Sequence, residues 1–212
     1  MDLSFQNIYI ARKRIEIDEM ARPREFDKQK ALLQAMRLFW SKGYEATSIS
    51  ELLKATGLSK SSLYDTFGSK RELFLEAFDE YRKERMRKLH GYLTQCPTAL
   101  ASIHAFFEMV VEHARNEEQP FGCMSCNEAA ELGPHDVEVQ QLVEQDFVGM
   151  EDSFALAIER GIQDGSISPT KDARKLARFL CASHQGLQIM ARAKTAPQRL
   201  DDTLSVMMSV LE

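Results

Sequence analysis

The chain has 212 residues, of which 44% are hydrophobic and 28% charged, and its net charge is −5. This composition supplies enough apolar side chains for a packed core without disulfides, which argues against an intrinsically disordered chain. No run of about eighteen or more apolar residues occurs, and the first residues lack the basic-then-apolar order of a signal peptide. We therefore expect a soluble, cytoplasmic protein that does not bind membranes.

The charge is unevenly distributed along the chain. Residues 20–75 hold ten basic and six acidic side chains, a net charge of +4, whereas residues 76–212 hold fourteen and twenty-two, a net charge of −8. Because polyanions attract basic surfaces, this split favours a small domain that binds nucleic acid and a larger domain with another role. Residues 1–19 show no sustained helical pattern, and we expect them to form a poorly ordered extension.

The first two predicted helices have clear start and stop signals. Over residues 27–42, apolar side chains recur at three- and four-residue steps, and Gly43 supplies a C-terminal cap. A second helix begins at Ser48, which has the spacing of a capping box with Glu51. Gly57 ends this helix after about two turns.

Two further helices follow directly. Ser59 can cap a third helix over residues 60–67, and Gly68 ends it. Ser69 and Glu72 repeat the capping-box spacing and open a fourth helix.

The second and third helices, joined by a short turn with a glycine, have the form of a helix-turn-helix unit, whose second helix enters the major groove of DNA. The third helix begins with short polar side chains, which allow the backbone to approach base edges. Helix starts also present free N–H groups and the positive end of the helix dipole to a phosphate. The candidate DNA contacts are Thr47, Ser48, Ser59, Lys60, Ser61, Ser62, Tyr64, Ser69 and Lys70.

The rest of the chain also reads as helical, without strand alternation or internal repeats. Glycine and proline residues separate the expected helices. These cover residues 80–94, 98–116, 123–132, 136–164, 170–194 and 198–211. The predicted fold is all-α, with an N-terminal three-helix helix-turn-helix domain over residues 20–75 and a larger C-terminal helical domain over residues 76–212.

Two segments, GYEATSI at 43–49 and TGLSKSSLYDTFGSKREL at 56–73, resemble the DNA-binding signature of the TetR (tetracycline-repressor) family. The resemblance covers roughly residues 26–78. It implies a homodimeric transcriptional repressor that binds double-stranded, near-palindromic operator DNA and is released from it by a small-molecule effector. It also implies that the C-terminal domain binds a small-molecule effector of unknown identity and dimerises.

Residues for the effector site are less distinct. Aromatic, methionine and histidine side chains suit a deformable apolar cavity, although they suit a solid core equally well. The candidates are Phe106, Met109, His113, Cys123, Phe154 and His184. The apolar stripes of residues 136–164 and 170–194 resemble the dimer-forming helices of the family, and an internal core remains the alternative.

Four cysteines are expected to be reduced in the cytoplasm. Cys123 and Cys126 stand near a predicted helix start, where the helix dipole can lower the pKa of a thiol. The alternative function is therefore a regulator that senses oxidants or electrophiles through Cys123, and a remote alternative is a cysteine-dependent enzyme. We expect neither enzymatic activity nor a cofactor, and no metal site, because a structural zinc site would need two further ligands.

Overall fold

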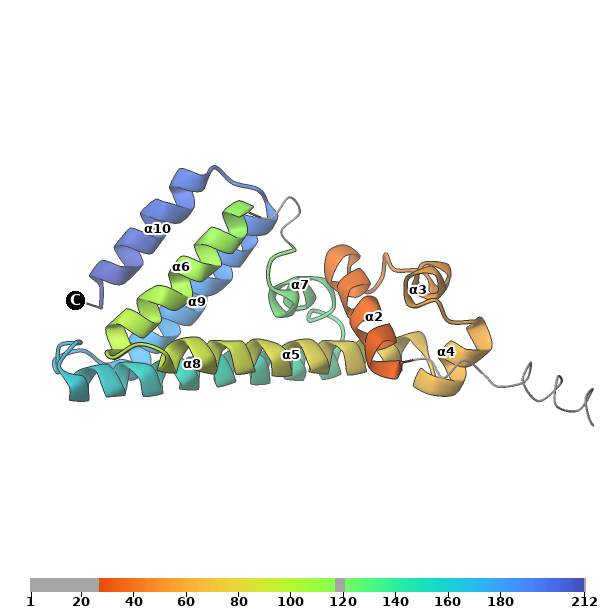
Figure 1. The fold of residues 1–212 in the computed structure, drawn as a ribbon, viewed down its shortest axis with the longest axis horizontal. Coiled ribbons are helices and arrows are strands. Elements are labelled where there is room, and N and C mark those ends of the chain that lie inside the picture. The colour runs from red at the N-terminus through yellow and green to blue at the C-terminus, as the bar shows by residue number, and fades with distance from the viewer. Residues whose placement is uncertain (1–26, 117–120, 212) are drawn as a thin grey trace, which may run out of the picture.

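The computed structural model describes residues 27–116 and 121–211, and this part of the chain is built from helices (Figure 1). The proposed extension over residues 1–19 lies outside the described residues. The helices are α2 (Lys28–Lys42), α3 (Ile49–Thr56), α4 (Lys60–Phe67), α5 (Lys70–Thr94), α6 (Ala99–Asn116), α7 (Met124–Glu131), α8 (Val137–Asp164), α9 (Ala173–Arg192) and α10 (Pro197–Ser209). The all-α prediction is confirmed, and most predicted helix ends agree within about three residues.

Side-chain caps define the starts of the N-terminal helices, at Ser48 and Ser59 as predicted and at Asp27, which was not predicted as a cap. The side chain of Asp27 accepts from Lys30 N at 3.1 Å and caps α2, and Ser59 accepts from Ser62 N at 3.1 Å and caps α4. At α3 the capping box is complete, with Glu51 N donating to Ser48 Oγ and Ser48 N donating to the Glu51 carboxylate. Each such cap typically contributes about 1 kcal/mol.

Helix α5 corrects one expectation. Two helices were expected here, one opened by Ser69 and one over residues 80–94, but they form a single helix of 25 residues. Between Ser69 and Gly91 the sequence has no glycine or proline, and the buried face of the helix continues from Phe78 to Tyr81 and Leu89. The long helix thus runs from the N-terminal helices α2–α4, here called the head, into the helices that follow it, here called the body (Figure 1).

The apolar core has two parts. One, in the body, joins α5, α6, α8, α9 and α10. The other joins the head helices to α7 and the first turns of α8, through Cys123, Met124, Leu132, Val139 and Val143. The core of the head therefore includes residues more than forty positions beyond residue 75.

The expected apolar stripes of the two long helices lie in the internal core of the chain. On α8, Val139, Met150, Phe154 and Ile158 are buried, and on α9 Leu180 and Leu187 are buried. A separate set of large apolar side chains remains exposed on these helices, namely Val137, Val148 and Leu156 on α8 and Phe179 and Ile189 on α9. Across the described ranges, no helix combines the length and apolar character needed to cross a membrane.

Candidate nucleic-acid interface and thiol cluster

The recognition helix α4 is held by a small apolar base. Gly57 adopts φ +70° and ends α3 in the left-handed conformation, which suits glycine and turns the chain sharply. Leu63 is fully buried and Phe67 is 5% exposed, so one face of α4 is fixed against the head. Lys60, Ser61 and Tyr64 point to the exposed side of the same helix. This geometry presents a polar helix face on a rigid support.

The serines at the start of α4 form a compact cap. Ser59 Oγ lies 3.0 Å from Ser61 Oγ and 2.8 Å from Ser62 Oγ, besides accepting from the backbone of Ser62. Ser59 and Ser61 are exposed, and Ser62 is half-buried. Capping and contact with a phosphate are compatible at such a position, since hydroxyl groups can both accept and donate.

The N-terminus of α3 carries a negative charge from the Glu51 carboxylate. Hydrogen bonds from Lys42 and Ser48 lower the pKa of Glu51 to about 2, so its carboxylate is ionised and lies at this helix start. Thr47 is only 1% exposed, and its hydroxyl donates to Gly43 O at 2.6 Å. In this structure the Thr47 side chain stabilises the turn, whereas Ser48 remains exposed.

The beginning of α5 lies beside the same turn. Ser69 caps the helix by accepting from Glu72 N at 3.1 Å. The ammonium of Lys70 lies 4.2 Å from the centroid of the Tyr44 ring, which places a cation against the turn between α2 and α3. Arg71 extends the other way and forms ion pairs of 2.6 Å with Asp136 and 2.7 Å with Glu138, which join the head to the start of α8.

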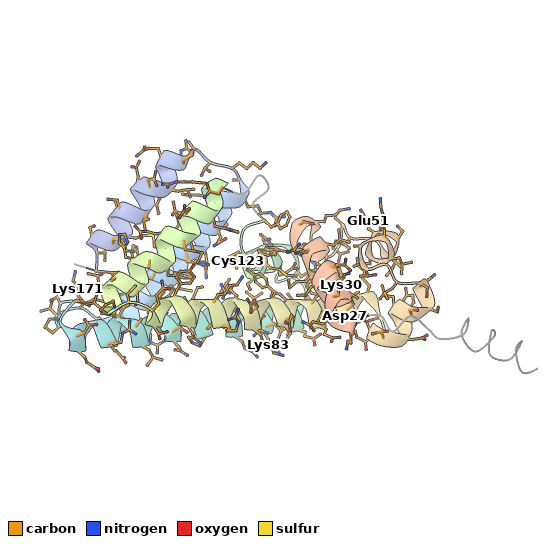
Figure 2. The ribbon with its side chains drawn as sticks, in the orientation of Figure 1. Asp27, Lys30, Glu51, Lys83, Cys123 and Lys171 are labelled. Atoms are coloured by element: carbon orange, nitrogen blue, oxygen red, sulfur yellow. The ribbon has the colours of Figure 1, made fainter. Side chains whose placement is uncertain are left out.

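Cys123 lies at the junction of head and body (Figure 2). It is the N-terminal cap residue of α7 and is 2% exposed. The Tyr81 hydroxyl donates to its sulfur at 3.5 Å, and Arg85 Nη1 lies 3.6 Å from the sulfur. Tyr81 Oη also accepts from Met124 N at 3.1 Å, so the tyrosine fixes both the thiol and the first turn of α7.

Hydrogen bonding from Cys126, together with the positive charge of Arg85 and the Tyr81 hydroxyl, lowers the pKa of the Cys123 thiol against the effect of burial. The pKa of Cys126 is raised, because it donates to Cys123 and is itself buried. Burial raises the pKa of Cys181 to about 11. The structure thus distinguishes one thiol as the group that ionises most readily among these three.

Arg85 has a second partner. Its Nη2 lies 2.7 Å from Asp146 Oδ2, and Ser125 Oγ donates to the same oxygen at 2.5 Å. Asp146 is 3% exposed. One buried guanidinium is therefore shared between a carboxylate and a thiol of lowered pKa, which compensates negative charge on both.

Comparison with known proteins agrees with this architecture. A family model described as bacterial regulatory proteins, tetR family, matches residues 31–77. A second, described as tetracyclin repressor-like, C-terminal domain, matches residues 99–207. The chain belongs to the tetR family. The TetR resemblance of its sequence is thereby confirmed, and the chain is a transcriptional regulator with a DNA-binding head.

The relatives of this tetR-family chain include two curated regulators. It is 33% identical to the uncharacterized HTH-type transcriptional regulator YezE of Bacillus subtilis, over 91% of this chain and all of the relative. It is 30% identical to the HTH-type transcriptional repressor ComR of Escherichia coli, over 84% of this chain and 86% of the relative.

Among solved structures, a cysteine-substituted variant of the TetR family regulator CifR, in complex with a 26-bp double-stranded operator DNA, superposes with a TM-score of 0.81. It is 29% identical and covers 91% of this chain and all of that chain.

The residues proposed for an effector site of this regulator are distributed over three places. Phe106 contacts both Phe154 and His184, with ring centroids 5.7 Å apart in each pair. Burial lowers the pKa of His184 to about 3, so its imidazole is neutral. Met109 packs at the edge of this core. This aromatic group is close-packed core.

His113 lies elsewhere, in the wall of a cavity of about 20 Å³ that Trp40 and Phe121 also line. Such a volume holds about one water molecule. Cys123 belongs to the group of side chains described above, which we call the thiol cluster and which comprises Tyr81, Arg85, Cys123, Cys126 and Asp146. The structure does not bring the six proposed effector residues into one site.

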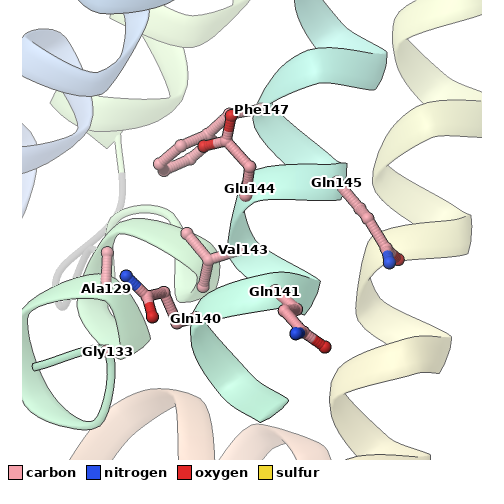
Figure 3. Close-up of a pocket in the computed structure, with 8 residues that line it drawn as sticks. All are labelled: Ala129, Gly133, Gln140, Gln141, Val143, Glu144, Gln145 and Phe147. Atoms are coloured by element: carbon pink, nitrogen blue, oxygen red, sulfur yellow. The ribbon is translucent and has the colours of Figure 1, made fainter. Parts of the chain in front are cut away.

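A larger groove, of about 530 Å³, opens between α7 and α8 (Figure 3). Three glutamines and Glu144 line it, together with Ala129, Val143 and Phe147. Tyr81, Arg85, Cys123 and Asp146 are not among the residues that line this groove.

Sequence reasoning missed the partners of Cys123. Tyr81 and Arg85 are four residues apart on α5 and therefore share one face, and Asp146 interrupts the apolar stripe of α8. A buried charge on each of two packed helices was the available signal, but the sequence does not show which helices pack.

Proposed function

We propose that this regulator is a homodimeric repressor that binds a near-palindromic operator and is released when a small molecule acts on its body. The observation that carries the proposal is the exposed polar face of α4, with Lys60, Ser61 and Tyr64 on a fully packed base. In this orientation Lys60 and Ser61 read base edges, and Tyr64 and Lys70 contact phosphates. The repressor relative ComR and the operator complex of CifR support this assignment.

The exposed apolar residues of α8 and α9 supply the dimer face. Leu156 is 66% exposed and Ile189 61%, and these two helices pack against each other within the chain. Gly186 lies between Phe179 and Ile189 on α9, and a methyl group there would meet no other atom, so the backbone is open to a partner helix. Large exposed apolar side chains on paired helices suit a symmetric interface.

The signal enters at Cys123, whose thiol has a lowered pKa and a cationic partner. In the reducing cytoplasm expected from the sequence, this thiol is free to react. Because its sulfur is buried, the effector class is a small peroxide or electrophile rather than a bulky molecule. This role is that of a regulator and not of an enzyme, because modification of Cys123 changes DNA binding and is not a step in the turnover of a substrate.

The chemical step consumes one peroxide. The Cys123 thiolate attacks a peroxide oxygen, the O–O bond breaks, the leaving oxygen takes a proton, and the sulfur becomes a sulfenic acid. The Cys126 thiol then attacks this sulfur, which forms a disulfide and releases water. A disulfide across the first turn of α7 strains that turn and displaces the helix.

The DNA assignment is tested by anisotropy with duplex DNA that the parent protein has selected from a random pool. Tyr64→Phe and Lys70→Ala should weaken binding to selected and random DNA about equally, and Lys60→Ala should change sequence preference. Lys88→Ala, on the exposed side of α5, is the matched control and should bind like the parent. Unchanged affinity of the Tyr64 and Lys70 variants would refute the docking.

The thiol assignment is tested by treating operator complexes with mild hydrogen peroxide. The parent should lose affinity, the Cys123→Ser variant should keep it, and Cys96→Ser, in the turn between α5 and α6, should respond like the parent. A parent that keeps its affinity, or a Cys123→Ser variant that loses it equally, would show that Cys123 only packs.

A further inference from the structure

Helix α7 reaches from the thiol cluster to the turn that begins the helix-turn-helix unit. Its last residue, Glu131, contacts the segment between α2 and α3, although 86 residues separate it from Glu45. Glu131 Oε1 accepts from Glu45 N at 2.8 Å, and Oε2 accepts from Tyr44 N at 3.3 Å. A carboxylate of the body thus binds two consecutive backbone N–H groups of the head.

Gly43 makes this contact possible. It has φ +89°, a conformation that side chains other than glycine rarely adopt, and a Cβ built there would overlap the Glu131 carboxylate. Gly43 O in turn accepts from the buried Thr47 hydroxyl. The turn from Gly43 to Thr47 is therefore shaped around a group from α7.

The other end of α7 is anchored as firmly. The Trp40 indole on α2 donates to Gly122 O at 3.0 Å, and Tyr81 Oη accepts from Met124 N. The eight residues of α7 span about 12 Å as a single helix. A displacement at Cys123 therefore moves Glu131 with it, since a short helix behaves as one rigid element.

The position of the Tyr44–Glu45 turn bears on DNA binding. Tyr44 carries the ring against which Lys70 lies, and Ser48, the N-terminal cap of α3, follows four residues later. Two charge-assisted hydrogen bonds to the turn fix where α3 begins. Because Glu131 occupies the N–H groups of Tyr44 and Glu45, these donors hold the body to the head and are not free for a phosphate.

We propose that Glu131 is a positioning residue for operator binding, which holds the turn between α2 and α3 in its DNA-competent place and transmits displacement of α7 to it. The positioning role stands on the contacts of Glu131 alone. The transmitting role rests on the proposed thiol function of Cys123.

The experiment compares Glu131→Ala and Glu131→Gln with the parent, and uses Glu159→Ala, an exposed residue of α8, as a matched control. Operator affinity is measured on the full-length, reduced dimer with DNA selected by the parent. Glu131→Ala should lower affinity about 10-fold or more, and Glu131→Gln, which keeps one carbonyl acceptor, should lose less. The control should bind like the parent.

Amide hydrogen exchange separates positioning from general loss of stability. Well below the melting temperature, the amides of Tyr44 and Glu45 should exchange faster in Glu131→Ala, while those inside α5 and α8 should not change. An alanine variant with parental affinity and parental exchange at these two amides overturns the positioning role. Equally faster exchange throughout the chain also overturns it, because the effect would then be global.

The transmitting role has its own readout. Peroxide should reduce the affinity of the parent by a larger factor than that of Glu131→Ala, because the variant has lost the connection. An equal factor in both proteins overturns transmission through Glu131. If peroxide has no effect on the parent, the thiol function fails, and the affinities of the reduced proteins still decide the positioning role.

Discussion

Glu128 allows a quantitative test of the packing around α7. This residue is fully buried, and neither of its carboxylate oxygens has a hydrogen-bond partner among the described residues. Burial, with a smaller contribution from the charge of Glu131, raises its pKa to about 8, while Arg192 acts in the opposite direction. The test is the Glu128→Gln substitution, which keeps the shape and removes the titration.

The raised pKa of Glu128 determines whether the free energy of unfolding rises or falls with pH. Between pH 4.5 and about 8 the folded protein holds a proton that the unfolded chain releases, so the free energy of unfolding falls as pH rises and levels off above about 8. Each pKa unit corresponds to about 1.4 kcal/mol. From pH 6 to pH 9 the carboxyl group therefore costs the parent roughly 2–3 kcal/mol of stability.

Urea unfolding at pH 6 and pH 9 measures this loss, at one protein concentration because dissociation of the proposed dimer would be coupled to unfolding. The free energy of unfolding of Glu128→Gln, relative to that of the parent, should increase by roughly 2–3 kcal/mol from pH 6 to pH 9. Glu159→Gln on the exposed face of α8 should follow the parent. If the Glu128 variant follows it as well, Glu128 does not carry a raised pKa and our description of α7 packing is wrong.

Three further predictions concern the core, the buried ion pair and the N-terminus. Phe154→Ala should lower the free energy of unfolding by about 3–5 kcal/mol in urea titrations, because it leaves a cavity between Phe106 and Phe107. Arg85→Met should lower the free energy of unfolding by about 3–5 kcal/mol in the same assay, because it leaves the Asp146 carboxylate buried without its ion pair. In this variant, thiolate absorbance should also show a higher pKa for Cys123 than in the parent. A chain that begins at Met20 should melt and bind DNA like the full chain, and a large fall in its melting temperature would show that residues 1–19 belong to the fold.

The local signals of the sequence were sufficient for the head. Serines at helix starts and glycines at helix ends act through neighbouring backbone atoms, so Ser48, Ser59 and Gly57 could be placed from spacing alone. The same reasoning failed within α5, because helix continuity there depends on the absence of a stop signal and on packing against α8.

The body shows why long-range features escaped prediction. The stripe that contains Phe154 resembles a dimer face in the sequence, with an internal core as the alternative, and the packing of α6 against α8 and α9 assigns it to the core. The contact of Glu131 with the turn at Tyr44 joins segments 87 residues apart, and no periodicity encodes it. The cationic environment of Cys123 likewise depends on Arg85, which the sequence shows only as one charge on a helix.

In the proposed complex, two copies of α4 read one operator. Sequencing the DNA that the full-length protein selects from a random pool tests this arrangement. We expect an inverted repeat whose half-sites are centred about 34–36 Å apart, or a multiple of that distance, with enrichment lost in the Lys60→Ala, Tyr64→Phe double variant. Selection of a single asymmetric site, or no enrichment over random DNA, would contradict it.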